Sequence, residues 1–174
     1  MPTVDTVTPT RTNARDQFLE VYDQEYNRTL RVLRAYPVAK EDLKPHPKSK
    51  SAREVAWNFV IEQGAIEKAL TTGFDFENPM NFPPAPPLGE IIRIFEETHK
   101  KITGLVGGLR EEELYRPVRF FVGPGKIGDL PLMQILWTFL HDQIHHRGQF
   151  SVYLRMADGK VPSIYGPSLD EPWR

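Results

Sequence analysis

Four segments carry apolar residues at helical spacing, and loops marked by proline separate them. This periodicity predicts helices over residues 14–35, 51–71, about 88–105 and 130–156. Ser51 and Glu54 have the spacing of a capping box at the start of the second helix. Asp129 is expected to cap the fourth helix, with Pro131 in its first turn. Four long helices with little strand signal predict an all-α protein built as a four-helix bundle.

The loops of this bundle are long, which favours crossover connections between its helices. Residues 118–127 are the exception to the helical pattern, because VRFFV is apolar and β-prone and GPGK signals a turn. One short β-like segment is therefore expected there. We expect a single domain over residues 1–174, with residues 1–13 as a flexible arm and residues 157–174 as a tail packed on the body.

Composition excludes several functional classes. The chain has no cysteine, which rules out a disulfide scaffold, a thiolate nucleophile and a cysteine-ligated metal. Its net charge of −1 and the lack of a basic stripe argue against nucleic-acid binding. The sequence has no apolar run of about 20 residues for a membrane span and no signal-peptide core. A cytoplasmic protein is expected.

Three of the five histidines fall in the stretch HDQIHHRGQ, residues 141–149. On the fourth helix, Asp142 and His146 form an i, i+4 pair at the core-facing edge. His141 and His145 form a second such pair that points outward, as expected of a surface or interface feature, and they rank lower as metal ligands. On the second helix, the flank of the buried face presents two candidates that could complete a site with the first pair, Asn58 and Glu62.

Two interpretations of this group remain open. In the first, Asn58, Glu62, Asp142 and His146 bind a metal ion, or Glu62 and His146 act as a general acid–base pair. In the second, Asp142 fixes the imidazole of His146 in a structural pair, and Glu62 forms a salt bridge with an arginine such as Arg147 or Arg155.

The run HHRGQFSVYLRMADGKVPSIYGPSLDEPW, taken with WNFVIEQ in the second helix, resembles the DinB/YfiT-like family from about Asp16 to Trp173. The resemblance implies a bundle of down-up-up-down type with long crossovers. It also implies a divalent metal, commonly nickel or zinc, held by three histidines. Some members are thiol-dependent transferases and others are isomerases, dimers are common, and the family name refers to expression in a stress response.

The family pattern places its three ligands at Asn58, Asp142 and His146, so two histidines are replaced. Oxygen donors suit manganese, iron or magnesium better than nickel or zinc. We therefore expect a pocket between the second and fourth helices that holds a divalent metal (manganese, iron, nickel or zinc), with Glu62 as an additional candidate ligand. The pocket would also take a small-molecule substrate or a thiol cosubstrate. Such a protein could be a thiol-dependent transferase or a hydrolase. The alternative is a metal-free homodimeric module whose family site has degenerated.

Overall fold

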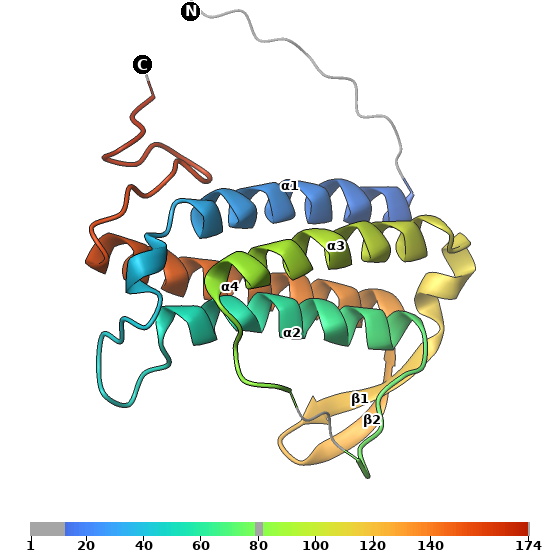
Figure 1. The fold of residues 1–174 in the computed structure, drawn as a ribbon. Coiled ribbons are helices and arrows are strands. Elements are labelled where there is room, and N and C mark those ends of the chain that lie inside the picture. Colours follow the sequence, from blue (N-terminus) through green and yellow to red (C-terminus); the bar gives the residue numbers. More distant parts are fainter. Residues whose placement is uncertain (1–12, 79–81, 174) are drawn as a thin grey trace, which may run out of the picture.

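The computed structural model describes residues 13–78 and 82–173, so residues 1–12 of the expected N-terminal arm lie outside the described part. The elements follow one another along the chain as shown in Figure 1. They are α1 (Ala14–Arg34), the short 3-10 helix η1 (Val38–Lys40), α2 (Ala52–Leu70), α3 (Leu88–Gly107), a second 3-10 helix η2 (Glu111–Tyr115), β1 (Pro117–Gly123), β2 (Lys126–Pro131) and α4 (Leu132–Met156).

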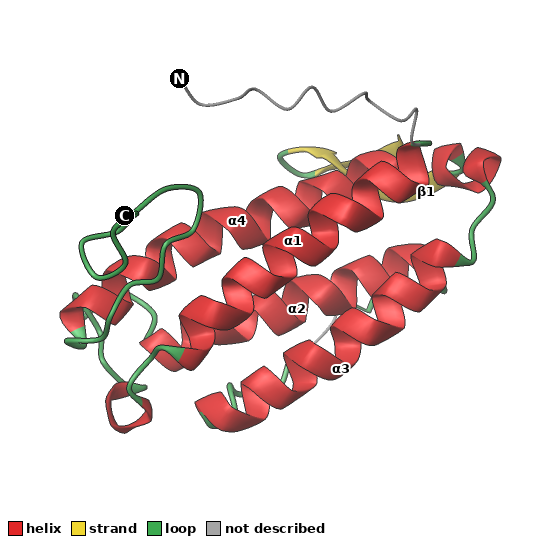
Figure 2. Ribbon diagram, turned by 90° about the horizontal axis from the view of Figure 1, so that it is seen from above, coloured by secondary structure: helices red, strands yellow, loops and turns green. Residues whose placement is uncertain are grey.

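The four helices form a bundle of down-up-up-down type, which confirms the predicted fold. Helices α2 and α3 run in the same direction, and α1 and α4 run in the opposite direction (Figure 1). Helix α1 packs against α3 and α4, and so does α2, so α1 and α2 lie diagonally across the bundle (Figure 2). Residues 71–87 connect the two parallel helices, and residues 79–81 among them lie outside the described part. No helix in the described ranges is long and apolar enough to cross a membrane.

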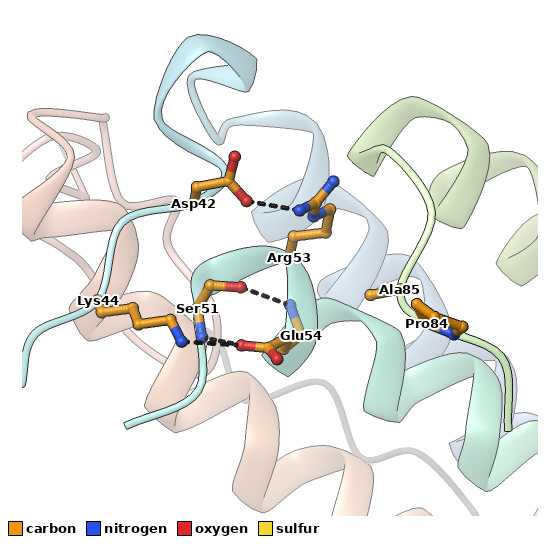
Figure 3. A pocket seen from close by; sticks show the side chains of 7 residues that line it. All are labelled: Asp42, Lys44, Ser51, Arg53, Glu54, Pro84 and Ala85. Carbon is orange, nitrogen blue, oxygen red and sulfur yellow. Dashed lines mark hydrogen bonds and ion pairs between the residues drawn. The ribbon is translucent and has the colours of Figure 1, made fainter. Parts of the chain in front are cut away.

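The start of α2 follows the sequence prediction. The hydroxyl of Ser51 accepts a hydrogen bond from the Glu54 amide at 3.2 Å, and the Ser51 amide donates to the Glu54 carboxylate at 2.6 Å. Figure 3 shows this capping box beside the Asp42–Arg53 ion pair. The small cavity at this helix end, about 250 Å³, is lined by charges that already have partners, so it is a poor candidate for a functional site.

The predicted start of α4 is wrong. Asp129 does not cap the helix but lies in β2, paired with Arg119 of β1, and the helix begins at Leu132. The chain stays extended up to Pro131 because β1 and β2 form an antiparallel hairpin across residues 117–131. The Leu132 amide then donates to the Arg116 carbonyl at 3.0 Å. The β-like segment expected at 118–127 is confirmed as this hairpin.

The C-terminal segment after α4 contacts α1 and α4. The Arg31 guanidinium binds the carboxylate of Glu171 at 2.6 Å, and the hydroxyl of Tyr165 accepts from Arg147 of α4 at 2.6 Å. Arg147 is almost completely buried at 2% exposure and forms an ion pair with Glu25 of α1 at 2.6 Å. An ion pair inside the bundle therefore joins α1, α4 and the tail.

Candidate metal site

Helices α2 and α4 bring two carboxylates and one imidazole together at the surface between them. The Nε2 atom of His146 lies 3.1 Å from the Oε1 atom of Glu62 and 3.8 Å from the Oδ1 atom of Asp142. One ligand atom from each of the three residues lies within 4.8 Å of the other two. Glu62 is buried, His146 is partly buried and Asp142 is exposed. We call these three residues the carboxylate–imidazole group.

The helical geometry explains this convergence. Asp142 and His146 are four residues apart on α4, so their side chains share one face. Glu62 projects from the face of α2 that packs against α4. Asn58 lies one turn before Glu62 and lines a cavity of about 520 Å³ together with His146. Of the four predicted residues, the structure therefore brings three into one group and places the fourth beside it.

Among the described residues, no lysine or arginine forms an ion pair with Glu62, and its partner at short distance is the imidazole of His146. Burial, followed by the negative charge of Asp142, raises the pKa of Glu62 to about 9, although Lys50 acts in the opposite direction. The Oε2 atom of Glu62 is buried and has no hydrogen-bond partner among the described residues. A buried carboxylate in this situation requires a proton or a cation.

The ring of His146 is oriented by its neighbour on α4. Its Nδ1 atom lies 3.0 Å from the Oε1 atom of Gln149, and the amide nitrogen of Gln149 lies 2.9 Å from Nε2 of His145. With the Gln149 amide in this orientation, its oxygen accepts from His146, which matches the tautomer that carries the proton on Nδ1. The lone pair of Nε2 then faces Glu62 and Asp142, which is the orientation of a metal-ligating histidine.

The residues present fit a divalent metal ion. Two donors that each lie about 2.1 Å from a shared ion are separated by about 3.0 to 3.5 Å, and the contact between Glu62 and His146 falls in this range. Two carboxylates and one imidazole form a harder donor set than three histidines, which suits manganese or iron and is also compatible with zinc. The group could therefore hold a metal.

The other residues singled out in the sequence lie elsewhere. His141 is exposed and stacks on Trp137 with ring centroids 5.9 Å apart, and His145 is exposed and contacts Gln149. The alternative pairing of Glu62 with an arginine does not occur, because Arg147 turns toward α1 and Arg155 pairs with Asp170 in the tail.

Sequence reasoning missed the role of Lys50, which precedes the α2 cap. Its Nζ atom donates to the Oδ1 atom of Asn58 at 2.8 Å, so the amide oxygen of Asn58 is already bound by a cation. The spacing could have indicated this contact, since the residue before a helix cap can reach the first turns of that helix. In the sequence, Lys50 did not stand out from the other lysines of the same loop.

Comparisons with known proteins agree with this architecture. The DinB family model matches residues 8–173. The uncharacterized protein YrdA of Bacillus subtilis (strain 168) is 28% identical over 163 residues, which cover 90% of each protein.

Two solved structures share the fold. A DinB-like protein from Bacillus cereus ATCC 10987 superposes with a TM-score of 0.73 at 22% identity, covering 86% of this chain and 97% of that one. The DinB-like protein YjoA from Bacillus subtilis gives a TM-score of 0.66 at 18% identity, covering 91% and 99%. The sequence match over nearly the whole chain and the shared bundle lead to one conclusion: this chain belongs to the DinB family.

Proposed function

We propose that this protein binds one divalent metal ion through Glu62, Asp142 and His146 and acts on a small molecule in the adjoining cavity. The observation that carries the proposal is the carboxylate–imidazole group itself: a buried carboxylate with no lysine or arginine ion-pair partner among the described residues faces an imidazole nitrogen at 3.1 Å, beside a second carboxylate. The cavity of about 520 Å³ next to His146 falls within the size range of small-molecule sites.

Each residue has a distinct role in this proposal. Glu62 and His146 hold the ion from the buried side, and the exposed Asp142 leaves the opposite side open to solvent and substrate. Gln149 keeps the His146 ring in position. When bound, the ion would act as a Lewis acid and lower the pKa of a coordinated water or thiol. Since the chain has no cysteine, a thiol for a transferase reaction would have to arrive with a cosubstrate.

A second candidate function has one specific observation in its favour. The ammonium of Lys50 binds Asn58 and lowers the pKa of Glu62, so it supplies part of the positive charge that a metal would bring. In this alternative the protein binds no metal, and Glu62 and His146 share a proton as an acid–base pair or as a structural contact. The two candidates make opposite predictions about metal content.

Metal titration of tag-free protein tests the choice. Protein stripped with a chelator is titrated with Mn²⁺, Fe²⁺, Ni²⁺ and Zn²⁺, and bound metal is measured by elemental analysis and by thermal shift. We expect about one equivalent of bound ion, and affinity losses of about 10–100-fold or more in Glu62→Gln, Asp142→Asn and His146→Gln. His141→Gln is the matched control, because this histidine lies on the same helix outside the group.

Two results would contradict the metal proposal. The first is protein that takes up none of the four ions, which would leave the proton-sharing alternative. The second is an equal loss of metal in His141→Gln and His146→Gln, which would place the ion on the outer face of α4.

A further inference from the structure

A second cavity, with a volume of about 470 Å³, opens beside the carboxylate–imidazole group and is lined mainly by phenylalanine. It takes six of the ten phenylalanines of the chain. They come from the α2–α3 connection, from β1 and from α4: Phe74, Phe76, Phe82, Phe120, Phe121 and Phe139. We call this space the phenylalanine cavity. Ile61 and Ala65 of α2 complete its apolar wall, and Lys68, Asp75 and Asn78 add polar groups to the lining.

The wall of this cavity is built by aromatic packing rather than by isolated exposed rings. The ring of Phe120 lies 4.7 Å from that of Phe74 and 5.5 Å from that of Phe139, centroid to centroid. Two further rings remain open to solvent, since Phe121 is 53% exposed and Phe82 is 38% exposed. A preformed concave surface of this kind, with exposed aromatic rings, is typical of a ligand site.

The phenylalanine cavity lies close to the group between α2 and α4. Phe139 precedes Asp142 by one turn of α4, and Ile61 is adjacent to Glu62 on α2. A smaller cavity of about 230 Å³ shares Ile61 and Phe82 with the phenylalanine cavity. The smaller cavity also shares Lys50 and Asn58 with the cavity beside His146. The three cavities therefore follow one another along α2, with α4 beside the two outer cavities and residues 82–85 beside the middle one, and we call this series the groove.

The two ends of this groove differ in charge. At the end opposite the phenylalanine cavity, the Lys50 ammonium binds only the neutral amide of Asn58, and it forms no ion pair with a carboxylate of the described residues. A cation with neutral partners can bind an anion through a charge-assisted hydrogen bond. The groove is thus mainly aromatic at one end, where Lys68 and Asp75 bring opposite charges, and at the other end it carries a lysine without a carboxylate partner among the described residues.

We infer that this groove binds an elongated amphipathic molecule, with an aromatic ring in the phenylalanine cavity and a carboxylate at Lys50. Seven residues of α2 separate Asn58 from Ala65, which corresponds to about 10 Å along the helix. The cavity at the Lys50 end has His146 in its wall, so the carboxylate end of such a ligand lies nearest to the carboxylate–imidazole group. The inference rests on the proposed function in taking these three residues as the reacting part of the groove, but the binding itself requires only the two ends.

Chemically matched probes test the two ends separately. Phenylhexanoate with a terminal ring is long enough to span the groove. The corresponding alcohol has the same length but lacks the carboxylate, and phenylacetate is too short to reach both ends. Binding is measured by saturation-transfer NMR and titration, in metal-free and metal-loaded protein. We expect phenylhexanoate to bind about 5–10-fold more tightly than either comparison compound, since each of these loses one end of the contact.

Substitutions at each end of the groove, each with a control at a neighbouring residue, test which residues bind the carboxylate and the ring of the ligand. Lys50→Met is expected to weaken the binding of phenylhexanoate by about 5-fold and to leave the binding of the alcohol unchanged. Lys48→Met, in the same loop, is expected to change the binding of neither compound. Phe121→Ala is expected to weaken both compounds by about 3–10-fold, and the adjacent Val122→Ala, whose side chain does not line the cavity, is expected to weaken neither. Thermal melts check that each variant is folded.

The outcomes separate this inference from the metal proposal. If Glu62→Gln loses the metal but still binds phenylhexanoate, the groove is supported independently of the ion. Equal affinities for the acid and the alcohol would overturn the assignment of Lys50, and no binding of any probe would overturn the whole inference. A dimer in sedimentation that Phe121→Ala dissociates would also overturn it, because a second copy would then occupy the phenylalanine cavity.

Discussion

The ion pair between Arg147 and Glu25 gives the sharpest test of how this bundle is held together. Arg147 belongs to the HRGQ motif of α4, and its guanidinium contacts the Glu25 carboxylate and the Tyr165 hydroxyl, each at 2.6 Å. The Tyr165 hydroxyl in turn donates to Glu25 at 2.7 Å. We predict that Arg147→Met is strongly destabilising, although methionine is apolar and of similar length.

The magnitude follows from what the substitution leaves behind. Glu25 is 5% exposed and would keep only Arg28 and Tyr165 as partners. Breaking a buried pair costs about 3–5 kcal/mol, and the remaining contact with Arg28 favours the lower end of this range. For a chain of this size the loss corresponds to a decrease in Tm of about 6–15 °C. The double variant Glu25→Gln with Arg147→Met should lose less than the sum of the two single variants.

The pair also predicts a pH dependence. Burial acts to raise the pKa of Glu25, but the hydrogen bonds from Tyr165 and Arg147 and the charges of Arg147 and Arg28 outweigh it, so the pKa is lowered. Its contribution to stability is therefore fully present above the ordinary carboxyl pKa of 4.5 and is lost as the pH falls below that value. In Arg147→Met this acid-induced loss should be smaller.

Urea denaturation followed by circular dichroism, at neutral pH and near pH 4, measures both effects. Arg155→Met is the matched control, because Arg155 is half-exposed and pairs with Asp170 at the surface. We expect that control to cost no more than about 1 kcal/mol. A cost for Arg147→Met no larger than the control, or strict additivity in the double variant, would refute the reasoning.

Three further predictions follow from the site and the tail. Since the folded metal-free protein keeps the proton of Glu62 up to about pH 9, and the unfolded chain loses it near 4.5, the free energy of unfolding should fall as pH rises through this window. Glu62→Gln should flatten that slope, measured by urea denaturation with a chelator present. Lys50→Met should raise manganese affinity about 3–10-fold in equilibrium dialysis, by removing a nearby positive charge. Tyr165→Phe should cost about 1–2 kcal/mol in the same denaturation assay, because it removes the hydroxyl between Arg147 and Glu25.

Helical periodicity was sufficient to predict the bundle, because each helix buries one broad apolar face. The capping box at Ser51 was also readable, since both partners lie within four residues. The start of α4 was not, because Asp129 has the residue type of a helix cap and only its pairing with Arg119 across the hairpin places it in a strand. Strand pairing depends on contacts that a local pattern does not contain.

The angular positions of residues around α4 correctly grouped Asp142 with His146, but they did not identify Arg147 as buried. An arginine beside a histidine on a polar stretch is ordinarily exposed, and its burial here depends on Glu25 and Tyr165, which lie 122 and 18 residues away. The same reason explains why the arginine partner considered for Glu62 was misplaced. Pairwise charge contacts between distant helices are set by the packing, which spacing along one helix cannot supply.

The donor set also determines what chemistry the proposed metal site can support. Three neutral histidines leave a divalent ion with its full charge, whereas the ionised carboxylates of Glu62 and Asp142 neutralise it. An ion held in this way attracts an anionic substrate less strongly than one held by three histidines. Lys50, bound to Asn58, returns one positive charge to the groove beside the site. On this view the two carboxylates and the placement of Lys50 belong together, because they move the attraction for anions from the metal to a side chain.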